Sequence, residues 1–77
     1  MAKTRREEDL EIAAAFGERV RSVRLEAGMT QEQLAEAAGL HATFISNLER
    51  GYRVPTLPTV VRVARGLGEE VALLLPF

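Results

Sequence analysis

The sequence contains no cysteine and only one histidine in 77 residues. Without cysteine neither a disulfide framework nor a thiolate metal site can form, and one imidazole cannot make a metal-binding or catalytic histidine cluster. The apolar runs, such as 71–75, are far shorter than the roughly 18 to 20 residues that span a membrane. We therefore expect no metal, no cofactor, no enzyme activity and no membrane partner, and a soluble, cytoplasmic protein.

Apolar residues are abundant, at 47% of the chain, and they recur at helical spacing. This proportion is typical of a globular protein, and the length fits one small domain that a partner subunit would stabilise. No run alternates as a strand does. The predicted fold class is all-α and compact over residues 9–77, with helices from near Glu8 to Ala27, at 31–38, at 42–50, from Thr56 until Gly66 and Gly68 break it, and at 69–75.

Residues 1–8 are predicted to be an N-terminal extension of this domain. Two alternatives remain for it: a flexible, solvated tail, or an arm whose Lys3, Arg5 and Arg6 reach a phosphate or a minor groove. These residues also either fray or extend the first helix.

The first expected helix places Phe16, Val20, Val23 and Ala27 on one face, which we expect to be buried. Gly17 lies within this pattern, where glycine costs up to about 1 kcal/mol relative to alanine.

The second and third expected helices are joined by a tight turn. Thr30, followed three residues later by Gln33, is a capping-box pattern, and Gly39 ends this helix where a left-handed backbone is suitable. Ala35 has little bulk and Gly39 has no side chain. We therefore expect the two helices to cross closely at this spacing.

The third expected helix has an unusual outer face. Ile45 and Leu48 point inward, with Phe44 either packed at the edge of the core or touching DNA. The outward stripe comprises Ala42, Thr43, Ser46, Asn47 and Arg50. Asparagine bonds bidentately to adenine, and threonine offers a hydroxyl and a methyl group to thymine. This stripe favours a helix that lies in the major groove of DNA over an uncharged, solvated surface.

The net charge of −1 is unfavourable for a nucleic-acid binder, but the charges are unevenly distributed. Residues 41–68 have one acidic side chain, Glu49, against Arg50, Arg53, Arg62 and Arg65. This excess indicates either a surface that faces phosphates or a solvated, arginine-rich surface. The acidic remainder should keep non-specific DNA affinity low, because that affinity comes mainly from neutralising phosphates.

Glu49 follows Leu48 on the side of the third helix that faces the interior. A partly buried carboxylate needs a partner, and Arg24 on the first helix is the natural candidate. The alternative is two exposed charges that never meet. If the pair is buried, removal of one partner should cost about 3–5 kcal/mol.

A family resemblance rests on residues at fixed spacing: Gln31, Leu34-Ala35, Gly39-Leu40, Ile45-Ser46, Leu48-Glu49-Arg50-Gly51, Pro55, Ala64, Leu67 and Gly68. From about Phe16 to Leu75 the chain resembles the Cro/repressor family, the XRE-type helix-turn-helix proteins of bacteria and phages. The resemblance implies a five-helix, lambda-repressor-like domain. It also implies binding to palindromic operators as a homodimer.

The resemblance also implies site residues. His41, Ala42, Thr43 and Asn47 match base-contacting positions, and the outward stripe adds Ser46 to them. Gln31, Arg50 and Arg53 match positions that contact the DNA backbone, and Arg24 and Glu49 match the family's internal ion pair. The chain departs from the family pattern at Ala42, where many relatives have Gln or Arg, at His41, which replaces the usual cap, and at Glu70, where Ser is common.

The last expected helix is more apolar than a small monomer can easily bury, which is typical of an interface. We predict a dimer interface of Val71, Leu74, Leu75 and Phe77. Sedimentation equilibrium of the wild type and of a Leu74→Glu variant would test it. A twofold dimer would separate the two recognition helices by about 34 Å, one turn of DNA. The alternative is a monomer in which these residues fold back under the first helix.

The function predicted from the sequence is sequence-specific regulation of transcription, by a phage-type repressor or a restriction–modification controller-like protein with double-stranded DNA as its partner. The alternative is a protein-binding module, the antitoxin of a toxin–antitoxin pair, whose tail or arm wraps a toxin.

Overall fold

The computed structural model describes residues 2–77, which form five helices and no strand. The helices are α1 (Arg5–Glu26), α2 (Gln31–Ala38), α3 (Ala42–Glu49), α4 (Leu57–Leu67) and α5 (Val71–Leu74). The prediction of an all-α, five-helix domain is confirmed. Met1, the first residue of the expected extension, lies outside the described range. Within that range no helix combines the length and the apolar character needed to cross a membrane.

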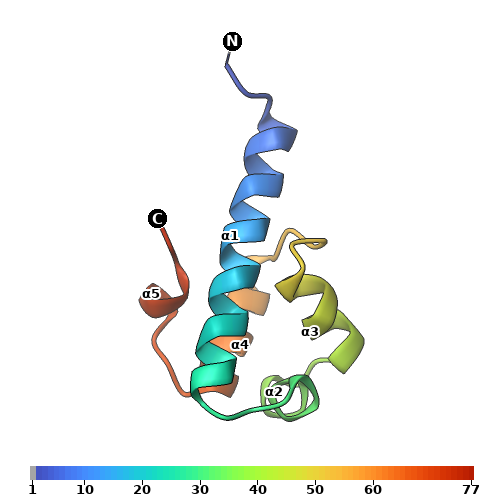
Figure 1. Cartoon of the computed structure of the whole chain (residues 1–77), viewed down its shortest axis with the longest axis vertical. Coiled ribbons are helices and arrows are strands. Elements are labelled where there is room, and N and C mark those ends of the chain that lie inside the picture. The colour runs from blue at the N-terminus through green and yellow to red at the C-terminus, as the bar shows by residue number, and fades with distance from the viewer. Residues whose placement is uncertain (1) are drawn as a thin grey trace.

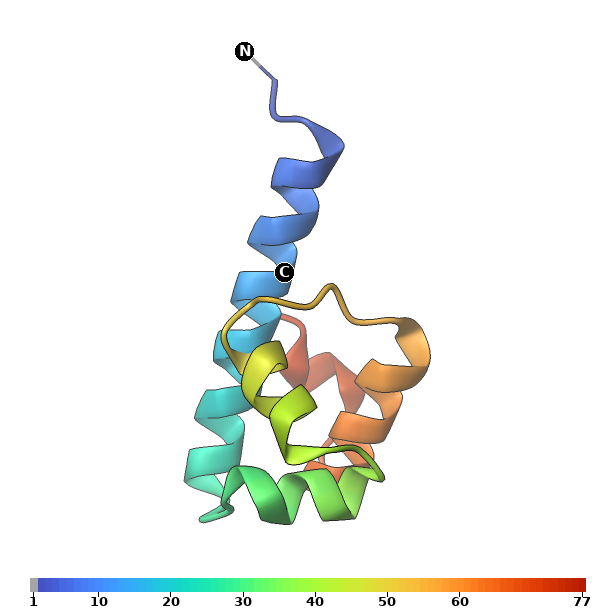
Figure 2. The ribbon, with the colours of Figure 1, turned by 90° about the vertical axis from the view of Figure 1, so that its right-hand side faces the viewer.

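Helix α1 is the longest element, and the other helices gather around its C-terminal half (Figure 1). Helices α2 and α4 pack against each other, α3 packs on α1 and α2, and α5 packs on α1 and α4. Helix α5 lies on the opposite side of α1 from α3, and the first turns of α1 protrude beyond the rest of the molecule (Figure 1, Figure 2). One hydrophobic core unites side chains of all five helices, among them Phe16, Leu34, Ile45, Val63 and Leu74.

Capping residues explain where the helices begin. The hydroxyl of Thr30 accepts a hydrogen bond from the backbone of Gln33, whose side chain accepts one from the Thr30 backbone, so the expected capping box is present. A second box, Thr4 with Glu7, starts α1 at Arg5. The helix therefore begins three residues before the expected start near Glu8. Its last expected inward residue, Ala27, is an exposed C-cap, so the buried face ends at Val23 and Arg24.

Glycines within helices allow the closest helix contacts. A Cβ on Gly66 would lie 3.1 Å from Ala38 Cβ, so α4 approaches α2 at this point. Gly39 instead has a φ of 69° and open space around it. The expectation that Ala35 and Gly39 form the close crossing is wrong, because Gly39 is the left-handed cap. Gly66 also does not break α4, which continues to its own left-handed cap, Gly68.

Gly17 lies at the contact between α1 and α3. A Cβ there would collide with the carbonyl oxygen of Leu48 and lie 2.9 Å from that of Glu49. We expect Gly17→Ala to lower the free energy of unfolding by about 2 kcal/mol, because overpacking against backbone outweighs the gain in helix propensity. Thermal unfolding followed by circular dichroism measures this loss. Ser22→Ala, at an exposed position of the same helix, is the control, and a Gly17→Ala variant as stable as this control would contradict the prediction.

Candidate nucleic-acid interface

Helix α3 is anchored by its inner face and presents its outer face to solvent. Ile45 and Leu48 are fully buried in the core. On the outer face Thr43 and Arg50 are exposed, and the remaining members of the outward stripe, Ala42, Ser46 and Asn47, are half-buried. Figure 2 shows α3 on the side of the molecule that faces the viewer, above α2. The two faces divide as the sequence predicts except at Ala42, which is half-buried and packs against the core.

The small polar side chains of the outward stripe are not used to hold the fold together. Across residues 2–77, the side chains of Thr43, Ser46 and Asn47 make no hydrogen bond. Their backbones are engaged at the end of α3, where the carbonyl of Ser46 accepts from the backbone of Arg50 at 3.1 Å and that of Asn47 accepts from the backbone of Tyr52 at 3.0 Å. Hydroxyl and amide groups in this state are available to base edges or water.

His41 is the N-cap residue of α3, and its side chain makes no capping hydrogen bond. The imidazole is exposed beside the first turn of the helix. The structure thus places His41 next to Ala42 and Thr43, at one end of the outward stripe. The family resemblance implies a further base contact at this position.

A buried ion pair holds the C-terminal end of α3 to α1. Arg24 Nε lies 2.7 Å from Glu49 Oε2, and Arg24 Nη2 donates to Glu49 Oε1 at 2.9 Å. Arg24 Nη1 donates to the carbonyl of Met29 at 2.9 Å. Hydrogen bonding to Glu49 raises the pKa of Arg24 above its usual value, although burial acts in the opposite direction. The expected pair is present, and both residues are less than one-tenth exposed.

Gln31 extends this network to the start of α2. Its Nε2 donates to Glu49 Oε1 at 3.1 Å, so the residue expected at a phosphate also contacts the buried carboxylate. One N–H of the amide remains free for an acceptor outside the protein. The sequence did not predict this contact, because it depends on how α2 and α3 pack.

Two arginines after α3 lie over aromatic rings. The Arg53 guanidinium lies 5.2 Å from the centre of the Phe44 ring, and that of Arg50 lies 6.0 Å from the Tyr52 ring. Phe44 is half-buried against the core, as its edge-of-core alternative predicts, and cation–π attraction orients Arg53 above it. Sequence spacing gave no signal for either pair, because both depend on the path of the loop. Arg62 and Arg65 are exposed on α4.

The C-terminal segment differs from its expected form. Helix α5 covers only Val71–Leu74, and Glu70 makes no side-chain cap. Leu74 is fully buried in the core of the single chain, so we remove it from the candidate dimer interface. Val71 is half-buried against the same core.

The exposed apolar side chains of this segment are Leu73, Leu75 and Phe77, here called the C-terminal apolar surface. Its position is fixed by Arg19 of α1, whose Nε donates to the carbonyl of Leu73 at 2.7 Å. Sequence reasoning missed this bond between distant segments. The exposed residues Leu73, Leu75 and Phe77 therefore remain a candidate dimer interface.

The fold and sequence are similar to those of known regulators. The chain is 40% identical over 67 residues to the control protein C.BamHI of Bacillus amyloliquefaciens, across 86% of this chain and 83% of that protein. It is 42% identical over 66 residues to the control protein C.SmaI of Serratia marcescens, across 86% and 79%. The crystal structure of the restriction-modification controller protein C.AhdI from Aeromonas hydrophila matches with a TM-score of 0.80 and 33% identity, over 82% of this chain and 96% of that chain.

A family model described as helix-turn-helix matches residues 20–74, which include α2, α3 and the turn between them. The chain therefore belongs to the helix-turn-helix family, and the resemblance to Cro/repressor regulators that its sequence shows is confirmed.

Proposed function

We propose that this protein is a transcriptional regulator of the restriction–modification controller type that binds an inverted-repeat operator as a homodimer. The observation that carries the proposal is the outward stripe of α3, where small and hydrogen-bonding side chains lie at the surface without internal partners. Two control proteins are 40% and 42% identical to the chain over 83% and 79% of their own lengths. A phage immunity repressor is 37% identical over only 41% of its length, so the comparison favours the controller type over a phage repressor. DNA binding itself follows from membership of the helix-turn-helix family.

In this proposal α3 enters the major groove. His41, Thr43, Ser46 and Asn47 contact base edges, and Ala42 allows close approach or touches a thymine methyl group. Arg50, Arg53 and Gln31 contact phosphates on either side. Because Phe44 and Tyr52 lie under the two guanidinium groups, these arginines are already oriented before DNA binds.

The homodimer is supported by the C-terminal apolar surface. Phe77 is 72% exposed and lies beyond the exposed Leu73 and Leu75, on the side of α1 away from α3. A contact here leaves both recognition helices free, and an operator with half-sites about 34 Å apart would accommodate them. No catalytic step is part of this function.

Asn47→Ala and Arg50→Ala should have different effects on DNA binding. We expect Asn47→Ala to cost about 1–3 kcal/mol on the operator and to relax the preference at one base pair. Arg50→Ala should weaken all duplexes alike and flatten the salt dependence, because it removes a phosphate contact. Titration of operator and random duplexes at several salt concentrations measures both. Arg21→Ala, an exposed arginine on α1, is the control, and equal losses on both duplexes for both variants would contradict the assignment.

Selection of bound duplexes from a random library tests the proposed function as a whole. We expect enrichment of an inverted repeat with half-sites about one helical turn apart. Enrichment of a single, unrepeated site would refute the dimeric operator. No enrichment by folded protein would refute sequence-specific binding by this chain alone.

A further inference from the structure

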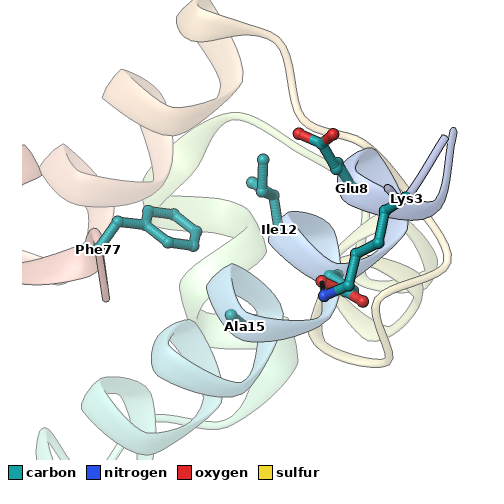
Figure 3. Close-up of a pocket in the computed structure, with 6 residues that line it drawn as sticks. Lys3, Glu8, Ile12, Ala15 and Phe77 are labelled. Atoms are coloured by element: carbon teal, nitrogen blue, oxygen red, sulfur yellow. Dashed lines mark hydrogen bonds and ion pairs between the residues drawn. The ribbon is translucent and has the colours of Figure 1, made fainter. Parts of the chain in front are cut away.

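The protruding part of α1 and the C-terminal segment enclose an open hollow of about 530 Å³. Figure 3 shows it from close by, with Ile12 and Phe77 facing each other across the space. We call it the Phe77 hollow, and it is lined by Lys3, Glu8, Glu11, Ile12, Ala15 and Phe77.

The Phe77 hollow is apolar at its centre and charged at its rim. Ile12 and Ala15 lie three residues apart on α1, so they share one face of the helix. The Ile12 side chain is 44% exposed and that of Phe77 is 72% exposed, so neither fills the space. At the rim Lys3 Nζ lies 2.7 Å from Glu11 Oε2. An apolar floor beside an exposed aromatic ring is suited to an apolar occupant.

The hollow is continuous with the C-terminal apolar surface and is held in place with it. Phe77 belongs to both, and the bond from Arg19 to the Leu73 carbonyl fixes α5 against α1. Buried Leu74 anchors the same turn in the core. A partner that covers Leu73 and Leu75 therefore also contacts the Phe77 hollow, which is already formed in the single chain.

We propose that the Phe77 hollow takes the Phe77 ring of a second copy of this chain, so that the protruding turns of α1 form part of the dimer interface. This inference rests on the homodimer of the proposed function. In a twofold interface the same patch meets itself, and each copy supplies both the ring and the hollow. Each Phe77 then packs on Ile12 and Ala15 of the partner subunit.

The charges on α1 fit this arrangement. Glu8, Ile12, Ala15 and Arg19 follow one another at steps of four, three and four residues, so they form one stripe along the helix. In a twofold dimer two such stripes can lie antiparallel, with the symmetry axis between Ile12 and Ala15. Glu8 of each copy then lies opposite Arg19 of the partner subunit. The stripe is therefore self-complementary in charge.

The same charges exclude DNA as the occupant. Glu7, Glu8, Asp9 and Glu11 are all on these turns of α1, and they outnumber Lys3, Arg5 and Arg6. Acidic side chains beside an apolar floor repel phosphate.

Sedimentation equilibrium over a range of concentrations tests the inference with Phe77→Ala and Ile12→Glu. Two rings are lost per dimer, so Phe77→Ala should raise the dimer dissociation constant about a hundredfold. Ile12→Glu should do at least as much, because it places a charge on the apolar floor. The matched control is Leu57→Ala, since Leu57 is also 72% exposed but lies at the start of α4. Circular dichroism verifies that each variant is folded.

A cross-link gives a second readout, which the cysteine-free chain makes simple. Mixed Ile12→Cys and Phe77→Cys variants are treated with a short bismaleimide at a protein concentration above the dissociation constant that sedimentation gives for the mixture. They should form a covalent heterodimer, whereas Leu57→Cys mixed with Phe77→Cys at the same concentration should not. A wild-type dimer whose dissociation constant is unchanged by both substitutions would refute the hollow and leave the homodimer intact. A wild-type chain that remains monomeric at every concentration would refute both.

Discussion

Replacement of Glu49 by alanine should lower the free energy of unfolding by about 3–5 kcal/mol. The substitution removes two hydrogen bonds from Arg24 and one from Gln31, and it leaves a guanidinium that is only 7% exposed without its counter-ion. A chain of this length has a total stability of about 4–12 kcal/mol, so the variant should be close to unfolding at room temperature. Urea unfolding followed by circular dichroism measures the loss.

Two controls separate the buried pair from charge in general. Glu11→Ala breaks the exposed pair with Lys3, in which both side chains are more than half exposed, and should cost less than about 1 kcal/mol. The double variant Arg24→Met with Glu49→Leu replaces the buried pair by apolar groups and should recover most of the stability that Glu49→Ala loses. If Glu49→Ala cost no more than Glu11→Ala, the pair would contribute nothing to the fold.

Leu74→Glu should unfold the monomer rather than only dissociate a dimer. The side chain is fully buried, and loss of a buried leucine alone costs about 2–5 kcal/mol, to which the burial of a carboxylate adds. Circular dichroism should show the loss of helix at a temperature where wild type is folded.

The neighbouring Leu73→Glu is the matched control, because Leu73 is 37% exposed. It should retain its helix content while it weakens any contact made by the C-terminal apolar surface. A folded, monomeric Leu74→Glu protein would contradict this expectation and return Leu74 to the candidate interface.

Features encoded within a few residues were predictable from the sequence. The Thr30 and Gln33 box, the left-handed Gly39 and the inner pair Ile45 and Leu48 all depend on local spacing, and the structure contains each of them. The Thr4 and Glu7 box is equally local. The apolar pattern gives no signal for a helix there, because the protruding turns bury little.

Most features that depend on tertiary packing were not predictable. The Arg24 and Glu49 pair is the exception, because a carboxylate on the inner side of a helix needs a cation as its partner. A four-residue helix has too few positions to show which of Leu73, Leu74 and Leu75 points inward, and the sequence pattern does not separate buried Leu74 from exposed Leu75. The glycine that makes the α2 contact is Gly66, far along the chain from Ala38. The aromatic rings under Arg50 and Arg53, and the bond from Gln31 to Glu49, likewise depend on paths that spacing alone does not specify.

The free side chains of Thr43, Ser46 and Asn47 have a consequence for how this protein can evolve. The fold depends on Ile45, Leu48 and Glu49, which alternate along the same helix with residues that hold nothing else in place. In the proposed function these side chains contact base edges, so their exchange should change which DNA sequence is bound. The thermodynamic cost should be small, since surface substitutions are usually within about 0.5 kcal/mol. In the proposed function, target preference and folding therefore depend on different residues of one short helix, so substitutions can change the first without loss of the second.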